Sequence, residues 1–330
     1  MPRETGTILV TGGCGFIGSN LIQFLSRAGL RVTVLDLEPA PIFFPDSGEH
    51  GAGAVNDVEF IVGDIRDRDL CRRAMIGMDA VVHLAAESGI PPSVEDPETN
   101  FMVNVDGTLS LLLAAKDAGV QQFILASSGA VLGRHDPPVD ERTPASPVSP
   151  YGASKLAAEA YCLAFGATYG MSAVALRFAN IYGPGSSHKR SVVAEFCKSA
   201  LRGEPLTIFG DGSQTRDFLY IDDLLAAIQG CLGRPDLSGV FQMGCGFGVS
   251  VLDVAEVIQG LREGQGRSVP PPDFRPARAF EVHDCYYRIG KAGDAFGFNP
   301  SIGFREGVQR TWTWFQKNAT GREAATGSSE

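Results

Sequence analysis

Two side chains with proton-transfer chemistry stand four residues apart in this sequence. Tyr151 and Lys155 begin an apolar stretch with helical spacing, and residues i and i+4 of a helix share a face. A tyrosine loses its proton near pH 10, and a neighbouring ammonium favours the phenolate, which would give a base that works near neutral pH. Such a pair often lies unused on a helix surface. Ser128, at the end of an apolar run upstream, adds a second hydroxyl and favours a catalytic role.

A glycine-rich turn near the start of the sequence suits a phosphate ligand. It follows the apolar run Thr7–Thr11 and opens a helical stretch, where backbone N–H groups can bind a pyrophosphate. Asp36 ends the next apolar run, where a carboxylate accepts hydrogen bonds from ribose hydroxyls and repels a 2′-phosphate. We therefore predict a dinucleotide site that prefers NAD to NADP, with a solvated strand end as the alternative for Asp36. The turn residues expected to contact the cofactor are Gly12, Gly15, Phe16, Ile17 and Gly18.

Short apolar runs alternate with helical stretches through the first half of the chain. Such continuous runs are typical of strands that are buried on both faces, and their alternation with helices indicates a doubly wound parallel α/β sheet of the Rossmann type. The predicted strands are Thr7–Thr11, Arg31–Asp36, Val58–Val62, Ala80–Leu84, Gln122–Ser127 and Ser172–Phe178. The predicted helices are Ile17–Ala28, Thr99–Ala118 and Ser149–Tyr169.

Residues that follow the third and fourth predicted strands are further cofactor candidates, because ligands of doubly wound sheets bind at the carboxyl ends of the strands. Asp64 and Ile65 come after the third strand, and a helix N-cap is the alternative role of Asp64. Leu84, Ala85 and Ala86 follow the fourth strand, where small side chains would let a dinucleotide pass close to the backbone.

The regular alternation of apolar runs and helical stretches ends at about Asn180. We expect two interleaved units, because the predicted helix Asp222–Leu232 and the predicted strand Val240–Gly244 could return to the first one. Small polar residues at the end of the chain predict disorder there. The expected division is a cofactor-binding domain at 1–180 with returning segments near 217–245, a smaller α/β substrate-binding lobe at 181–318, and a disordered tail at 319–330.

Charge and cysteine content limit the classes of partner. With 28 Lys and Arg against 38 Asp and Glu, a net charge of -10, the chain lacks a general positive field, so we expect no nucleic-acid partner. A phosphate compound must then be held by local groups, such as helix N-termini and single arginines. Seven scattered cysteines without a CxxC pair indicate neither a disulfide framework nor a metal site and favour a reducing cytoplasm. No apolar run predicts a membrane span or a signal peptide.

Several motifs together resemble the extended short-chain dehydrogenases/reductases, and within them the NAD-dependent sugar-nucleotide epimerases typified by UDP-glucose 4-epimerase. The resemblance extends from Thr7 to about Lys317. It implies bound NAD, a UDP-sugar substrate, and 4-epimerisation through a transient 4-keto sugar. The motifs are Thr11–Gly18 (TGGCGFIG), Asp64, His83–Ala86 (HLAA), Asn104–Thr108 (NVDGT), Ser127–Gly133 (SSGAVLG), Tyr151–Lys155 (YGASK), Arg177–Gly183 (RFANIYG) and Thr215–Asp223 (TRDFLYIDD).

The resemblance also implies roles for the catalytic residues. The hydroxyls of Ser128 and Tyr151 would contact the 4-OH of the sugar, and Tyr151 would remove its proton. Lys155 would hold the nicotinamide ribose and lower the Tyr151 pKa. Asn104, counted among the cofactor-site residues, would brace the active-site helix.

A further set of residues is implied to bind the substrate. Asn180 would contact the diphosphate, Arg216 and Arg278 the pyrophosphate and ribose, Glu281 the uridine ribose, and Phe209 would border the uracil pocket. Plainer alternatives are a turn cap at Asn180, a core position for Phe209 and a surface ion pair between Arg216 and its neighbour Asp217. The full set is Ser127, Ser128, Asn180, Val192, Phe209, Arg216, Arg278, Glu281 and Cys285.

Some residues depart from the patterns of this family. Dehydratases and uronate decarboxylases carry an acid directly after the active-site Ser or Thr, whereas this chain has Gly129 and Ala130 there, which favours simple epimerisation. Leu132 replaces a Tyr, and residues 88–91 match neither the glucose-type nor the glucuronate-type pattern. Cys285 falls where residue size is implied to limit bulk at the sugar C2. These departures leave the chemistry in place and put the identity of the sugar in question.

Three sugars and two other function classes stay open. Gly129 and Ala130 would enlarge the pocket near the reacting ring, and Ser127 and Ser128 could donate to a C6 carboxylate. UDP-glucose/UDP-galactose and UDP-glucuronate/UDP-galacturonate are therefore equal candidates, and a UDP-N-acetylhexosamine comes third. The other classes are a net NAD-dependent oxidoreductase and a non-catalytic NAD-binding sensor, which would not need the catalytic hydroxyls.

Two predicted helices carry more apolar residues than one core-facing stripe requires. Thr99–Ala118 contains a run of leucines, and Ser149–Tyr169 has leucine and alanine on several faces. Burial against the sheet would explain part of this surface. The resemblance implies instead a homodimer that is formed through a four-helix bundle.

Overall fold

The computed structural model describes residues 6–39, 58–268, 270–277 and 282–326, and its centre is a sheet of seven parallel strands. The strand order is β11-β6-β5-β4-β1-β2-β3, so the chain reverses its direction across the sheet between β1 and β4, the place where such sheets bind ligands. The strands are β1 (Thr7–Thr11), β2 (Arg31–Asp36), β3 (Val58–Val62), β4 (Ala80–His83), β5 (Gln122–Ser128), β6 (Ser172–Phe178) and β11 (Gly239–Met243).

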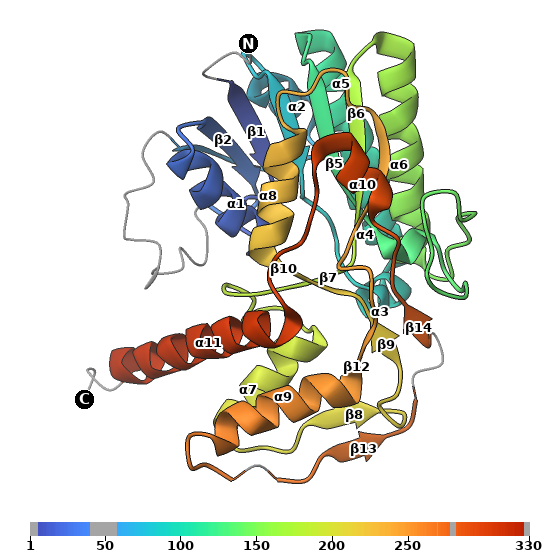
Figure 1. Ribbon diagram of the computed structural model, residues 1–330. Helices are drawn as coiled ribbons and strands as arrows, with labels where there is room; N and C mark the ends of the chain where they lie inside the picture. Colours follow the sequence, from blue (N-terminus) through green and yellow to red (C-terminus); the bar gives the residue numbers. More distant parts are fainter. Residues whose placement is uncertain (1–5, 40–57, 269, 278–281, 327–330) are drawn as a thin grey trace.

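Helices cover both faces of this sheet (Figure 1). On one face α1 (Phe16–Arg27) packs against α8 (Ile221–Cys231), which in turn contacts α10 (Gly290–Phe296). On the other face lie α2 (Arg68–Ala74), α5 (Thr108–Ala118) and α6 (Pro150–Tyr169). Neighbouring residues of β1 belong to different buried clusters, Ile8 to one and Leu9 to the other. Burial on both faces explains why the strands appear in the sequence as continuous apolar runs.

The predicted doubly wound α/β fold is confirmed. The six predicted strands are present, although β4 ends at His83, one residue early, and β5 continues to Ser128. The segment predicted as a strand at Val240–Gly244 is β11, which pairs with β6 at the edge of the sheet. The segment predicted as a helix at Asp222–Leu232 is α8.

Local signals set both ends of α6, the helix that carries Tyr151 and Lys155. The Ser149 hydroxyl accepts a hydrogen bond from the N–H of Gly152, and proline at the first helical position needs no N–H partner. Gly170 ends the helix with a φ of 74°, a left-handed conformation that glycine adopts without strain. The start of this helix, which positions the candidate catalytic pair, is therefore strongly defined by the sequence.

The single helix predicted over Thr99–Ala118 forms three segments. These are α4 (Pro97–Phe101), a π-helical turn η1 (Met102–Gly107) and α5 (Thr108–Ala118). A π turn interrupts the regular helical register and often occurs at functional sites. Here it carries Asn104, whose buried side chain binds the backbone of Glu87.

The second lobe lies below the sheet domain in Figure 1. Its helices are α7 (Val192–Arg202), α9 (Val251–Glu263) and α11 (Phe304–Thr326). Its short strands pair as β8 with β13, β7 with β10, and β9 with both β12 and β14. Their bounds are β7 (Asn180–Tyr182), β8 (Thr207–Phe209), β9 (Thr215–Arg216), β10 (Phe218–Tyr220), β12 (Val249–Ser250), β13 (Asp273–Arg275) and β14 (Asp284–Cys285).

Helix α11 corrects one prediction about the end of the chain. The small polar residues from Ala319 predicted a disordered tail, but the helix continues to Thr326. Val308 and Trp312 are buried and attach its first turns to the core. Extending an existing helix adds one hydrogen bond per residue without a new nucleation cost, and alanine, glutamate and arginine are good helix formers. No helix within the described ranges is long and apolar enough to cross a membrane.

Candidate active site

Two hydroxyls meet at the carboxyl end of β5. Tyr151 lies in the first turn of α6, and its hydroxyl is hydrogen-bonded to Ser128, the last residue of the strand. The backbone N–H of Tyr151 donates to Ser93 Oγ at 3.1 Å, which ties the helix start to α3 (Ile90–Glu95). The Ser128 hydroxyl also accepts from the N–H of Ala130 at 3.2 Å and so caps the turn η2 (Gly129–Val131). The hydroxyls of Ser128 and Tyr151, which the resemblance implies for the sugar 4-OH, are thus close together.

Lys155 lies one turn further along the same face of α6. Its side chain is buried, with 4% exposed, and Nζ donates to the carbonyl oxygen of Ala126 at 3.0 Å. Burial lowers the pKa of this ammonium to about 8, because the charged form loses hydration. At neutral pH Lys155 is therefore charged in most molecules. One of its three N–H groups is bound to Ala126, and two are left for a ligand.

The expected lowering of the Tyr151 pKa by Lys155 is not what the structure gives. Burial raises the pKa of Tyr151 above its usual value, and the hydrogen bond from Ser128 acts in the opposite direction. The Lys155 ammonium points to the Ala126 carbonyl, so the desolvation of the phenolate dominates. A further positive charge beside the phenol would be needed to make it a base near neutral pH.

The glycine-rich turn is held by close backbone packing. A Cβ at Gly12 would lie 2.6 Å from the nitrogen of Ala85, and one at Gly18 would overlap the carbonyl oxygen of Gly12. Gly15 is the N-cap of α1 and provides no side-chain cap, so the first N–H groups of the helix face outward from the turn. Asp36 accepts the N–H of Cys14 at 2.8 Å, which excludes the alternative of a freely solvated strand end.

His83 connects the ends of two strands to η1. Its ring is buried, with Nδ1 2.7 Å from Thr11 Oγ1 and Nε2 2.9 Å from Thr108 Oγ1. The Thr108 hydroxyl donates to the carbonyl of Asn104, so it must accept from Nε2–H, and Nδ1 then accepts from Thr11. Burial, with a smaller effect of Lys155, lowers the His83 pKa to about 3 and keeps the ring neutral.

Asn104 is buried beneath the site and connects three of its segments. Its side chain is 1% exposed; Oδ1 accepts the Glu87 N–H at 2.9 Å, and Nδ2 donates to the Glu87 carbonyl and to Ser154 Oγ, both at 3.0 Å. Ser154 precedes Lys155 on α6. The side chain thus joins η1, the segment after β4 and the start of α6.

The two residues predicted after β3 have different surroundings. Asp64 binds Arg66 through an ion pair of 2.6 Å, which holds the pKa of its carboxyl below the usual value. Its alternative as an N-cap is wrong, because Asp67 caps α2. Ile65 is buried, and a Cβ at Gly107 would lie 2.6 Å from its Cδ1, so its side chain packs against η1. Only the backbone of Ile65 is therefore available for contact with a cofactor.

Ser127 is not available to a substrate, which corrects the prediction. Its hydroxyl donates to Glu159 Oε2 at 2.8 Å, and the residue is 3% exposed. Glu159 also pairs with Arg177 Nη2 at 2.6 Å, and both charges are buried. Successive residues of a strand point to opposite faces, so Ser127 turns toward this ion pair while Ser128 reaches the site.

The other predicted substrate residues lie on short elements of the second lobe. Asn180 begins β7, and its Nδ2 donates to the backbone carbonyl of Asp217 at 3.3 Å. Arg216 on β9 donates from Nη1 to the carbonyls of Thr215 and His283, at 2.7 and 2.9 Å. Val192 begins α7 and Phe209 ends β8, and both are half-buried. Cys285 ends β14, and Arg278 and Glu281 lie outside the described residues.

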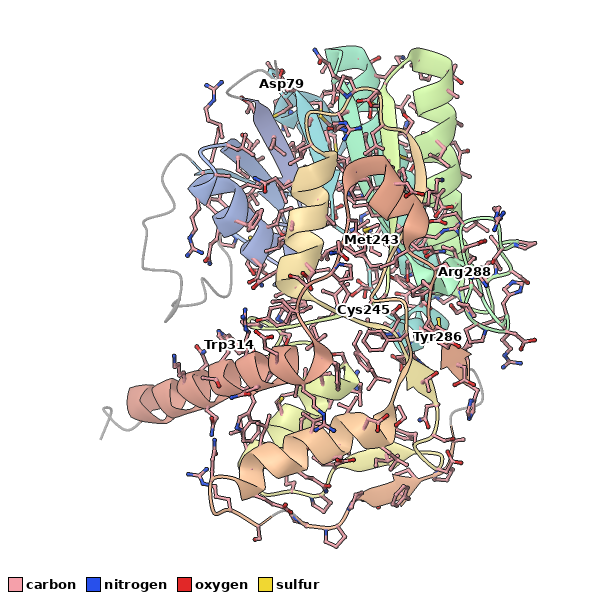
Figure 2. All side chains as sticks on the ribbon, viewed as in Figure 1. Asp79, Met243, Cys245, Tyr286, Arg288 and Trp314 are labelled. Carbon is pink, nitrogen blue, oxygen red and sulfur yellow. The ribbon has the colours of Figure 1, made fainter. Side chains whose placement is uncertain are left out.

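Asp217 has a larger role than the sequence indicated. Its carboxylate accepts the backbone N–H groups of Cys245, Gly246 and Tyr287, at 2.6, 3.1 and 3.4 Å. Because the residue is fully buried, its alternative as a surface ion-pair partner of Arg216 is wrong. Burial raises its pKa to about 6. It fastens the segments around Cys245 and Tyr286, which Figure 2 places where the sheet domain meets the second lobe.

Tyr287 is the main residue that the sequence analysis missed. Its phenol is buried, its hydroxyl lies 3.1 Å from Cys285 Sγ, and a Cβ at Gly129 would overlap that hydroxyl. The expectation that Gly129 enlarges the sugar pocket is therefore wrong, because Tyr287 fills the space. Only the packing of distant segments brings these residues together, so no local pattern marks Tyr287.

Comparisons with known proteins identify the family of this chain. A model of the NAD dependent epimerase/dehydratase family matches residues 8–244. The chain belongs to this family. The resemblance inferred from the motifs is thus confirmed, as is the expectation of an NAD-dependent enzyme of epimerase type.

Two curated relatives cover nearly the whole chain. UDP-glucose 4-epimerase of Mycolicibacterium smegmatis is 32% identical, over 94% of this chain and 99% of its own length. A dTDP-glucose 4,6-dehydratase of Streptomyces niveus is 31% identical, over 94% of this chain and 93% of its own length. Both branches of the family are thus similar to this sequence, so overall identity does not separate them.

Two solved structures are similar at the level of the fold. MoeE5 in complex with UDP-glucose and NAD has a TM-score of 0.85 at 33% identity and covers 95% of this chain and 100% of its own. UDP-glucuronic acid 4-epimerase of Bacillus cereus, in complex with UDP-glucuronic acid and NAD, has a TM-score of 0.83 at 29% identity and covers 94% and 99%.

The residues of the glycine-rich turn fit the NAD of this family. The outward N–H groups at the start of α1 suit a pyrophosphate, and no acidic residue occupies the first turn of that helix. The Asp36 carboxylate lies at the turn through its bond to Cys14, where it can accept from a ribose. Ala85 borders Gly12, and its small side chain leaves the carboxyl end of β4 open.

Proposed function

We propose that this chain is an NAD-dependent 4-epimerase that interconverts UDP-glucose and UDP-galactose. The observation that carries the proposal is the hydrogen-bonded pair of Ser128 and Tyr151, with Lys155 one helical turn away, beside a turn that fits NAD. A sensor that only binds NAD has no need of such a pair. Relatives and solved structures that act on or hold UDP-sugars support the substrate class.

The catalytic residues divide the work of proton transfer. Tyr151 removes the proton of the sugar 4-OH, and Ser128 holds that oxygen and the phenol in line. The Lys155 ammonium offers its two remaining N–H groups to a ribose and adds positive charge near the phenol. When bound in the adjoining turn, NAD supplies a reversible hydride acceptor whose cationic ring favours the phenolate. The 4-keto sugar turns over in the site, and once C4 has regained the hydride on its other face, Tyr151 returns the proton to the oxygen at C4, so the protein ends each cycle unchanged.

Two features that favoured a hexuronate in the sequence are changed by the fold. A C6 carboxylate was expected because Ser127 and Ser128 could donate to it and because Gly129 and Ala130 would leave space near the reacting ring. The Ser127 hydroxyl is bound to Glu159, and the space beside Gly129 holds the Tyr287 phenol. Both arguments for the glucuronate pair are thereby weakened, and we rank the glucose pair first.

The chain has no acidic residue directly after Ser128, where an elimination reaction would need a proton donor. Gly129 follows Ser128 and bears no acid, and the neighbouring Tyr287 hydroxyl is a poor proton donor because burial raises its pKa well above the usual value. We therefore assign the chain to the epimerase branch of the family and not to the dehydratase branch, despite the similar identities to both.

The test incubates the purified protein separately with UDP-glucose, UDP-glucuronate and UDP-N-acetylglucosamine and identifies the products by proton NMR. We expect UDP-galactose from UDP-glucose, without accumulation of reduced cofactor. Faster conversion of either other sugar would replace the proposed substrate. Steady formation of NADH would identify a net oxidoreductase, and bound NAD without any conversion would identify a sensor.

We propose that the protein acts as a homodimer through α4, α5 and α6. Phe101 on α4 and Tyr161 on α6 are large and exposed, at 55% and 45%, and Leu109 and Leu113 on α5 are half-buried. A second copy that packs the same helices against these would bury this surface in an isologous four-helix contact. We expect a dimer by sedimentation that Tyr161→Glu dissociates and Arg72→Glu, on α2, does not.

The proposed compartment is the cytoplasm. All seven cysteines are free thiols, five of them buried. A reducing environment keeps such thiols in this state, whereas an oxidising one selects for paired cysteines.

A further inference from the structure

The phenol of Tyr287 occupies the place of a side chain at position 129. Gly129 follows the catalytic Ser128, and a Cβ built there would overlap the Tyr287 hydroxyl oxygen and lie 2.7 Å from Cζ. Tyr287 is only 3% exposed. It follows β14 of the second lobe, so a residue of the substrate-binding lobe reaches the backbone beside the catalytic serine.

The surroundings of Tyr287 leave it little freedom. Its N–H donates to Asp217 at 3.4 Å, and Val139 binds the backbone on both sides of it, by accepting from Arg288 at 2.8 Å and donating to Tyr286 at 3.1 Å. The ring packs in a small buried cluster with Val131, Leu132 and Val139. The hydroxyl meets Cys285 Sγ at 3.1 Å, a weak partner that does not draw it away from Gly129.

The turn at Gly129 is also in contact with α6. A Cβ at Gly152 would lie 2.5 Å from the carbonyl oxygen of Ala130, so the helix start packs directly on the turn. Gly152 follows Tyr151, and Ala130 donates to Ser128 Oγ. The turn therefore contacts both Tyr287 and the helix that carries Tyr151, so a shift of either contact changes the distance between the hydroxyls of Ser128 and Tyr151.

We propose that Tyr287 is a positioning residue that presses the Ser128–Ala130 turn against α6 and thereby keeps the Ser128 hydroxyl bonded to Tyr151. This inference rests on the proposed function, in which these two hydroxyls handle the 4-OH proton. Gly129 is required because a larger residue and the phenol compete for one space. Tyr287 itself neither gives nor takes a proton in the cycle.

The main test uses Tyr287→Phe, which removes the oxygen that reaches Gly129 and keeps the ring in the core. We expect kcat to fall about tenfold with KM within about twofold, because substrate binding is not the step affected. The Ser128 hydrogen bond lowers the Tyr151 pKa, so loosening it should move the low-pH limb of kcat to higher pH. Tyr286→Phe makes the same chemical change one residue earlier and should leave kcat and its pH profile unchanged.

A double-mutant cycle tests the shared space. Gly129→Ala should lower kcat more than a hundredfold, and Gly129→Ala/Tyr287→Phe should be at least about threefold more active than Gly129→Ala alone, since the overlapping oxygen is gone. Effects that simply multiply, or a Tyr287→Phe enzyme with wild-type kcat and pH profile, would overturn the proposal.

A substrate-free measurement separates this inference from the proposed function. The Tyr151 pKa can be followed by ultraviolet titration of the NAD-bound protein, as the difference from Tyr151→Phe. We expect Tyr287→Phe to raise that pKa even if the wild type converts none of the UDP-hexoses. An unchanged Tyr151 pKa together with normal turnover of UDP-glucose would overturn the positioning role and leave the proposed function intact.

Discussion

Asp36 Oδ2 accepts the backbone N–H of Cys14 at 2.8 Å, so the carboxylate at the end of β2 is attached to the glycine-rich turn. From this place it can accept from both hydroxyls of an adenine ribose and repels a phosphate at the 2′ position. We expect Asp36→Ala to weaken NAD binding about tenfold or more and to narrow the preference for NAD over NADP. Fluorescence titration of both cofactors measures the two affinities. Asp69→Ala, at an exposed position on α2, should change neither, and an unaltered preference in Asp36→Ala would show that another group selects the cofactor.

Tyr151→Phe removes the proposed base and keeps the ring that packs at the start of α6. We expect kcat to fall by at least about a hundredfold while the variant folds and keeps its NAD, because only the proton-transfer group is lost. Proton NMR of product formation and the cofactor content of the purified variant provide the two readouts. Tyr169→Phe, at the exposed far end of the same helix, is the matched control. Substantial residual epimerisation in Tyr151→Phe would remove the tyrosine from the mechanism.

Arg216→Ala tests how an acidic protein holds a diphosphate. The chain has a net charge of -10, so few other cations can compensate for a lost guanidinium. A charge-assisted hydrogen bond contributes about 1.5 to 3 kcal/mol, which corresponds to a KM higher by about ten- to a hundredfold. Arg275→Ala, an exposed arginine of β13 paired with Asp273, should leave KM unchanged. Equal KM values for the two variants would mean that Arg216 does not contact the substrate.

The sequence predicted the sheet well because the parallel strands are buried on both faces and appear as apolar runs. Helix periodicity predicted that Tyr151 and Lys155 share a face of α6, whereas the role of Ser128 was implied by the resemblance to a known family. The prediction that Ser127 binds the substrate was wrong, because side chains alternate between the two faces of β5 and its hydroxyl faces Glu159. A strict period of two would have separated the two serines in advance.

Tyr287 and Asp217 could not be predicted, because their roles depend on contacts between segments that are far apart in sequence. Gly129 suggested an empty pocket, and only the fold shows a phenol from 158 residues later in that space. The Tyr151 pKa was misjudged for a related reason. Its helix neighbour is visible in the sequence, but the burial that outweighs that neighbour is a property of the folded chain.

His83 makes the stability of the fold sensitive to acid. Its folded pKa of about 3 lies far below the unfolded value of 6.5, so between these pH values the unfolded chain takes up a proton that the folded chain refuses. The free energy of unfolding therefore falls as pH falls through this window, by up to about 1.4 kcal/mol per pH unit for this one group. Burial raises the pKa of Asp217 from 3.8 to about 6, so between these pH values this group increases the free energy of unfolding as pH falls. Because Asp217 is present in both proteins compared below, its effect cancels in the difference.

Replacing His83 by glutamine isolates this contribution. At pH 7 we expect His83→Gln to lower the free energy of unfolding by about 1 to 3 kcal/mol, because the bonds to Thr11 and Thr108 are lost or strained. The difference from the wild type should shrink steadily as pH falls below 6.5, since glutamine does not titrate. Urea unfolding of both proteins between pH 7 and 4 measures the two slopes. Parallel slopes would mean that the folded protein takes up the His83 proton at the same pH as the unfolded chain, and Nδ1–H would then have to donate to Thr11 Oγ1 instead of accepting from it.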